Sequence, residues 1–145
     1  MSIFFDFEVG PNGRRFRRAV DGDKVDIQSF VNDITEHLFG PVDIGELIEL
    51  SALSICLIDE NKDVVGFMAL SDYPNVPGVD PGDWEIWLRN MFQKYFLSRN
   101  TLFIHFMCCA EAVDDFFLDE ALVSVFEHDA YLHQVVLLVP PQCPE

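Results

Sequence analysis

The sequence is poor in basic residues and contains no long apolar run. Nine Lys and Arg stand against 25 Asp and Glu in 145 residues, which gives a formal net charge of −16. Because a protein of this charge repels a polyanion, we expect no nucleic-acid binding. No run reaches the about 18–20 apolar residues of a membrane helix, and residues 1–6 lack the basic start of a signal peptide. We therefore expect no membrane partner.

Cysteine is also scarce. Only Cys56, Cys108, Cys109 and Cys143 are present, and two of them are adjacent, which is poor geometry for a framework of separate bridges. Cys56 and Cys108 lie in apolar, strand-like runs. These features favour buried free thiols in a reducing compartment and predict an intracellular protein.

The chain is nevertheless rich in core-forming residues, because half of it is hydrophobic and 14 residues are Phe. This composition excludes disorder for most of the chain, and the length fits one domain. Residues 1–20 hold four Arg against two acidic residues, whereas the remaining 125 hold five basic and 23 acidic residues. We expect the arginines to find acidic neighbours within the fold; alternatively, Arg14 and Arg15 belong to a docking patch for an acidic partner.

Apolar spacing and turn residues give an order of elements. The boundaries between elements are marked by Gly-Pro and Asp-Gly pairs, by prolines and by capping residues such as Asp23. The predicted strands are 14–20, 54–58, 64–70, 101–109 and 135–139. The first predicted helix is 23–38. Three more are expected: a short helix from 43, a helix from 83, and a helix opened by Asp114 and Asp115.

This order predicts the fold class. Residues 54–70 read as a β-hairpin, and the strand–helix–strand unit over 101–139 requires two parallel strands with a right-handed crossover. We therefore predict a mixed β-sheet flanked by helices, of the α+β or α/β class. Residues 1–13 are expected to be a flexible segment, 14–140 the domain, and 141–145 a tail or truncation point.

Several stretches carry a family resemblance. Residues 17–23 are similar to the first strand and helix cap of the acyl-CoA N-acyltransferase (Gcn5-related) fold. The stretches Leu-Phe-Gly at 38–40, Leu-Ser-Asp-Tyr-Pro-Asn at 70–75, Asp-Trp at 83–84 and Asn-Thr-Leu-Phe-Ile-His-Phe at 100–106 resemble the N-terminal domain family of cilia- and flagella-associated protein 61. Their order and approximate spacing agree over about residues 14–140.

The resemblance implies a partial acyltransferase-like, three-layer α/β/α sandwich. It also implies an axonemal component of the calmodulin- and spoke-associated complex at the base of radial spokes in motile cilia and flagella. The implied partners are other axonemal and radial-spoke-base proteins, with calmodulin as a candidate within the same complex. The implied location is the cytoplasm, cytoskeleton and ciliary axoneme. Family members are much longer than this chain.

The acyltransferase fold usually binds the acyl-CoA pyrophosphate at a turn of the form Arg/Gln-x-x-Gly-x-Gly/Ala, where glycines allow close backbone approach. The matching residues 108–117 contain neither glycine nor a basic residue, and they include Glu111, Asp114 and Asp115. One carboxylate about 4 Å from a phosphate charge costs roughly 1 kcal/mol in water and about 4 kcal/mol at a surface-like dielectric. We therefore expect no catalytic residues, no cofactor and no enzyme; the alternative is a divergent acyl-CoA-dependent N-acyltransferase or acyl-CoA-binding domain.

No metal site is expected. His105 and Cys108 should point to opposite faces of a strand, so they would not converge on one ion. Residues 59–63 resemble the start of a calcium loop, but Val64 occupies the position of the required glycine, and a hairpin turn is the better interpretation.

Two segments are candidates for protein contacts. Trp84, Trp87 and Tyr95 share one apolar stripe, which predicts either core packing or a docking surface. Residues 14–18 are a weaker candidate, as a calmodulin-binding element, because that mode normally uses an amphipathic helix and these residues read as a strand.

Overall fold

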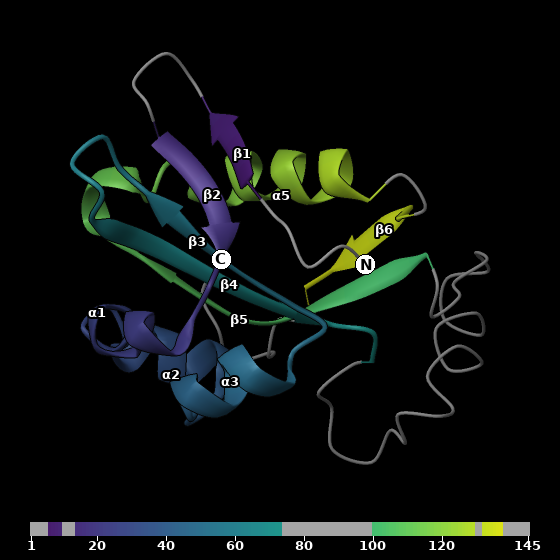
Figure 1. Cartoon of the computed structure of the whole chain (residues 1–145). Coiled ribbons are helices and arrows are strands. Elements are labelled where there is room, and N and C mark those ends of the chain that lie inside the picture. Colours follow the sequence, from purple (N-terminus) through teal and green to yellow (C-terminus); the bar gives the residue numbers. More distant parts are fainter. Residues whose placement is uncertain (1–5, 10–13, 74–99, 130–131, 138–145) are drawn as a thin grey trace.

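A computed structural model of the chain describes residues 6–9, 14–73, 100–129 and 132–137, the first four by their backbone alone. The described strands form one sheet in the order β1-β2-β3-β4-β5-β6 (Figure 1). Neighbours from β1 to β5 are antiparallel, whereas β5 and β6 are parallel. The predicted mixed sheet and hairpin are therefore confirmed. The strand bounds are β1 Asp6–Val9, β2 Arg14–Arg18, β3 Leu53–Ile58, β4 Val64–Ser71, β5 Thr101–Cys109 and β6 Gln134–Val136.

Helices cover both faces of this sheet (Figure 1). One face carries α1 (Lys24–Gln28), α2 (Asp33–Phe39) and α3 (Ile44–Leu50), and the opposite face carries α5 (Phe117–His128). Short 3-10 turns, η1 (Asp21–Asp23) and η2 (Glu111–Val113), precede α1 and α5. Within the described part of the chain, no helix is long and apolar enough to cross a membrane.

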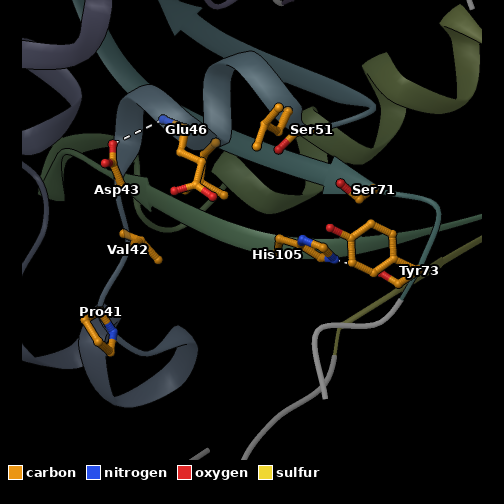
Figure 2. A pocket seen from close by; sticks show the side chains of 10 residues that line it. Pro41, Val42, Asp43, Glu46, Ser51, Ser71, Tyr73 and His105 are labelled. Carbon is orange, nitrogen blue, oxygen red and sulfur yellow. Dashed lines mark hydrogen bonds between the residues drawn. The ribbon is translucent and has the colours of Figure 1, made fainter. Parts of the chain in front are cut away.

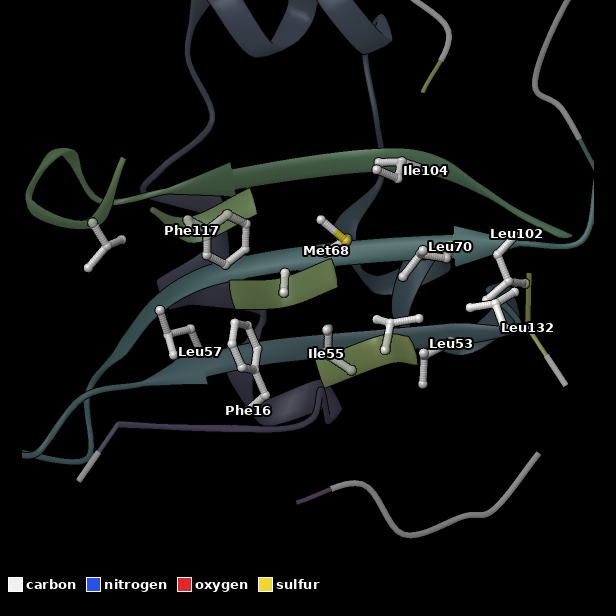
Figure 3. Packing of buried hydrophobic residues seen from close by; sticks show 13 residues of the cluster. Phe16, Leu53, Ile55, Leu57, Met68, Leu70, Leu102, Ile104, Phe117 and Leu132 are labelled. Carbon is white, nitrogen blue, oxygen red and sulfur yellow. The ribbon is translucent and has the colours of Figure 1, made fainter. Parts of the chain in front are cut away.

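Alternating side chains of the central strands divide the core between the two faces. On β3, Leu53, Ile55 and Leu57 pack with Phe117 of α5 (Figure 3), while Cys56 packs under α1–α3. The residues on β3 and β4 are buried almost throughout because helices cover the sheet from both sides. This packing makes β3 and β4 the rigid centre on which the surrounding loops are placed.

The single helix predicted for 23–38 is wrong, because the chain forms α1 and α2 with a break between them. Asn32 caps α2: its side-chain oxygen accepts the Thr35 amide at 3.0 Å, and the Thr35 hydroxyl accepts the Asn32 amide at 3.0 Å. This local cap competes with a continuous helix. The predicted stop is confirmed, since α2 ends at Phe39 and Gly40 adopts a φ of 77°.

The N-terminal segment also differs from the prediction. Residues 6–9, expected to be flexible, form β1 and pair antiparallel with β2 from Asp6 opposite Arg17 to Val9 opposite Arg14. The sheet orders this segment because β2 would otherwise leave one row of backbone groups without partners. The last strand is shifted and short, with β6 at Gln134–Val136 in place of 135–139. The predicted helix from 83 lies outside the described residues.

Candidate functional site

The turn between β5 and α5 is the segment where the resemblance to acyltransferases would place a cofactor. Ala110 joins it to the sheet by donating its amide to the Val65 carbonyl at 2.8 Å. The expectation that Asp114 and Asp115 open the helix is wrong: α5 begins at Phe117, and both aspartates lie in the preceding turn. The large Phe117 ring, buried at the first position of α5, fixes this start by packing on the sheet.

The charged side chains of this turn are all acidic. Glu111, Asp114 and Asp115 are exposed, and Asp119 and Glu120 follow in the first turn of α5. Acidic groups there interact favourably with the helix dipole but repel an incoming phosphate. A pyrophosphate at this turn would therefore be repelled by carboxylates at the place where phosphate binding requires free backbone amides.

Cys109 lies beside the same turn and is not an activated nucleophile. Its thiol lies 3.7 Å from Asp114 Oδ1. Burial and the neighbouring Asp114 carboxylate raise the pKa of Cys109 to about 11. The thiol is therefore protonated near neutral pH.

Arginines of β2 interact with acidic residues of the same domain. Arg14 donates from Nη2 to Glu120 Oε1 at 3.0 Å, and its guanidinium lies 4.4 Å from the centre of the Phe116 ring. Arg17 donates to both carboxylate oxygens of Asp23, at 2.8 and 2.9 Å. Acidic neighbours within the fold are thus confirmed for Arg14 and Arg17. Of the two arginines proposed for docking, Arg14 is half-buried in this contact and Arg15 is exposed.

Asp23 has a different role from the predicted helix cap. Its carboxylate makes no capping bond to α1 and instead accepts from Arg17 and from the Val20 amide at 2.9 Å. Cys56 Sγ lies 3.8 Å from Asp23 Oδ2. Burial by itself would raise the pKa of Asp23, but the hydrogen bonds from Arg17 and Val20 and the charge of Arg17 together lower it. The buried carboxylate therefore joins β2, η1 and β3.

The prediction that His105 and Cys108 point to opposite faces is wrong. Ala69 pairs with Phe106 and Leu70 with Ile104, so His105 is an extra residue of β5. Such a bulge shifts the alternation by one residue. His105 therefore lies on the α1–α3 side, as Phe106 and Cys108 do.

The bulge directs His105 into a pocket of about 260 Å³ between α3 and the ends of β4 and β5 (Figure 2). His105 is nine-tenths buried, and its Nε2 lies 2.7 Å from the Tyr73 carbonyl oxygen. The Tyr73 ring meets the imidazole edge-on, with the two ring centres 4.9 Å apart. The other walls are residues 41–43, then Glu46, Leu47, Leu50 and Ser51, and finally Ser71.

No motif in the sequence predicts this pocket, although residues 70–75 and 100–106, which supply part of it, belong to the stretches that carry the family resemblance. Trp84, Trp87 and Tyr95 lie outside the described residues. In the hairpin, Asp59 Oδ1 accepts the amides of Asn61 and Asp63, both at 2.9 Å, which confirms the predicted turn. Among the residues that the structure describes, no three His, Cys, Asp or Glu side chains are grouped so that they could hold a metal ion.

One comparison with known proteins bears on identity. The family model for the N-terminal domain of cilia- and flagella-associated protein 61 matches residues 15–145, which is nearly the whole chain. The match includes the acidic turn, the Arg17–Asp23 pair and the pocket with its bulged histidine. The chain therefore belongs to the family of the N-terminal domain of cilia- and flagella-associated protein 61.

Proposed function

We propose that this chain is a non-catalytic interaction domain of a cilium- or flagellum-associated protein. In this proposal it belongs to the calmodulin- and spoke-associated complex at the base of radial spokes. Membership of the family supports the ciliary location. The proposal that the domain is non-catalytic rests on the acidic turn between β5 and α5.

That turn argues against acyl-CoA as a ligand on electrostatic grounds. A phosphate-binding turn uses free amides, flexible glycine and an unopposed helix N-terminus. Here residues 108–117 hold no glycine or cation, and Glu111, Asp114 and Asp115 are exposed. Each carboxylate close to the phosphates would cost from about 1 to about 4 kcal/mol, depending on its exposure to solvent. The thiol of Cys109 is protonated and offers no nucleophile.

The charge distribution supports a role in binding basic proteins. The net charge is −16, and Arg14 and Arg17 are paired with acidic residues of the same domain. The exposed surface thus presents an excess of carboxylates, which favours association with positively charged partners. The proposed partners are other axonemal and radial-spoke-base proteins.

Calmodulin is proposed as a member of the same complex but not as a ligand of residues 14–18. These residues form β2, which pairs with β1 on one side and with β3 on the other. A calmodulin target normally presents an amphipathic helix. Binding by that mode would require β2 to leave the sheet and would break the Arg17–Asp23 pair.

Acyl-CoA binding is the second candidate, and one observation favours it. In the described residues, β6 pairs only with Thr101–Phe103 of β5, so the remainder of β5 has no strand on that side. The acyltransferase-like resemblance would place a cofactor along this part of the strand. A titration with acetyl-CoA separates the two candidates.

The location can be tested in motile cilia. A compact tag fused to the protein that carries this chain should appear by cryo-electron tomography as extra density at the base of the radial spokes. Cells that express the tag alone serve as the control. Extra density restricted to another axonemal position, or protein confined to the cell body, would contradict the proposed location.

A further inference from the structure

The pocket around His105 has the chemistry of a site for a positively charged side chain. We propose that it binds a lysine or arginine side chain from a basic segment of a partner protein. This inference rests on the proposed interaction role, and it specifies the chemical class of ligand that the His105 pocket binds. It follows from the size, lining and charge of the pocket.

Size restricts the ligand. The volume of about 260 Å³ is below the about 300–1,000 Å³ typical of sites for cofactors and drug-sized molecules. A single side chain is therefore a better match than a nucleotide. Two walls supply apolar surface, from Val42 on one side and from Leu47 and Leu50 on the other. Such surface suits the methylene stem of a long cationic residue.

The polar groups favour a cation. Asp43 and Glu46 both line the pocket, and none of the described residues that line it is Lys or Arg (Figure 2). The Asp43 carboxylate already accepts one hydrogen bond, from the Glu46 amide at 3.2 Å. The Glu46 side chain, by contrast, forms no hydrogen bond or ion pair with another described residue. Glu46 is therefore the principal counter-charge for an incoming cation.

His105 and Tyr73 complete the recognition surface. A carbonyl oxygen can only accept, so His105 donates from Nε2 to Tyr73 and holds the Tyr73 backbone at the edge of the pocket. The Tyr73 ring is 37% exposed at the rim, where an aromatic face can contact a cation. The Glu46 carboxylate and the Tyr73 ring thus line one pocket together with apolar walls, and each of them favours a Lys or Arg side chain.

The test is an NMR titration of the isotope-labelled chain with four short, capped peptides. They differ only at a central residue, which is Arg, Lys, Gln or norleucine. We expect the Arg and Lys peptides to shift the amide signals of Ser51, Ser71 and His105 in a saturable way, and the Gln and norleucine peptides to leave them unchanged. A stronger response to Arg than to Lys would assign guanidinium recognition, and an equal response would assign simple charge recognition.

Two isosteric variants show whether binding occurs in the pocket. Glu46→Gln should weaken the affinity for the Arg peptide about three- to fivefold. Glu49→Gln removes the same charge from the same helix outside the pocket and should leave the affinity nearly unchanged. An equal loss in both variants, equal binding of the norleucine peptide, or no saturable shift would overturn the inference. The ciliary location tested above would be unaffected by such a result, so the two failures are distinguishable.

Discussion

Arg17 on β2 holds the carboxylate of Asp23 with both terminal nitrogens of its guanidinium group, at 2.8 and 2.9 Å. Asp23 is 6% exposed, and it also accepts the Val20 amide. The pair connects the second strand of the sheet to the turn that starts the helical layer α1–α3. The ion pair with its two hydrogen bonds thus adds a polar connection to the apolar packing that holds α1–α3 on the sheet.

Replacing Arg17 with Met should lower the free energy of unfolding by about 1.5–3 kcal/mol, because it leaves a buried carboxylate without its charged donor. Urea unfolding followed by tryptophan fluorescence measures this difference. Arg15→Met is the matched control, since it removes the same group from an exposed position on the same strand. Equal destabilisation by both substitutions would show that the pair has no special role.

The pair also predicts a dependence of stability on pH. The folded-state pKa of Asp23 lies below its ordinary value of 3.8. The stabilisation it gives is therefore fully present well above pH 4 and is lost as the pH falls through the folded pKa. The difference in unfolding free energy between the natural chain and Asp23→Asn should be constant from pH 5 to 7 and should shrink below about pH 4. A difference that grows on acidification would reverse the assigned sign.

Gly66 on β4 should not tolerate even a methyl group. A Cβ there would lie 2.7 Å from Cδ1 of Phe117 and closer still to Cε1, and Phe117 is 1% exposed. Gly66→Ala should therefore destabilise the fold by about 1–3 kcal/mol, as overpacking does. In a double-mutant cycle, Phe117→Leu should make the same substitution less costly, because the smaller side chain relieves the clash. Additive effects would contradict this contact.

Thiol labelling should report the order of burial. Burial raises the pKa of Cys108 to about 12, and burial together with the nearby Asp23 charge also raises the pKa of Cys56. In a Cys143→Ser background at pH 7.5, iodoacetamide should modify Cys109 first, though slowly, and the other two only after unfolding. Mass spectrometry of peptide digests assigns the site. Rapid modification of Cys56 in the native protein would contradict its buried position between β2 and β4.

Much of the sheet could be predicted because its signals are local. The apolar runs of β3, β4 and β5 are continuous, and the polar residues 59–63 can only be a connection between strands. The parallel pairing of β5 and β6 follows from the intervening helix. The cap at Asn32 was not predicted, because the near-helical apolar spacing through residues 25–38 indicates one continuous helix.

The features that define the His105 pocket could not be predicted from local sequence patterns. The extra residue at His105 depends on the register between β4 and β5, which is set by packing on both faces of the sheet. The start of α5 at Phe117 likewise depends on the space above Gly66, because the aromatic ring occupies it. Strand alternation and capping residues are local rules, and here tertiary contacts override them.

Isothermal titration of the chain with acetyl-CoA tests the central claim most directly. We predict no saturable heat at millimolar ligand and no acetyl transfer to added amines, because the turn after β5 presents Glu111, Asp114 and Asp115 to the phosphates. A charge-reduced variant, in which these three residues are replaced by Gln, Asn and Asn, would show how far repulsion alone prevents binding. Micromolar binding by the natural chain, or transfer of its acetyl group, would contradict the account.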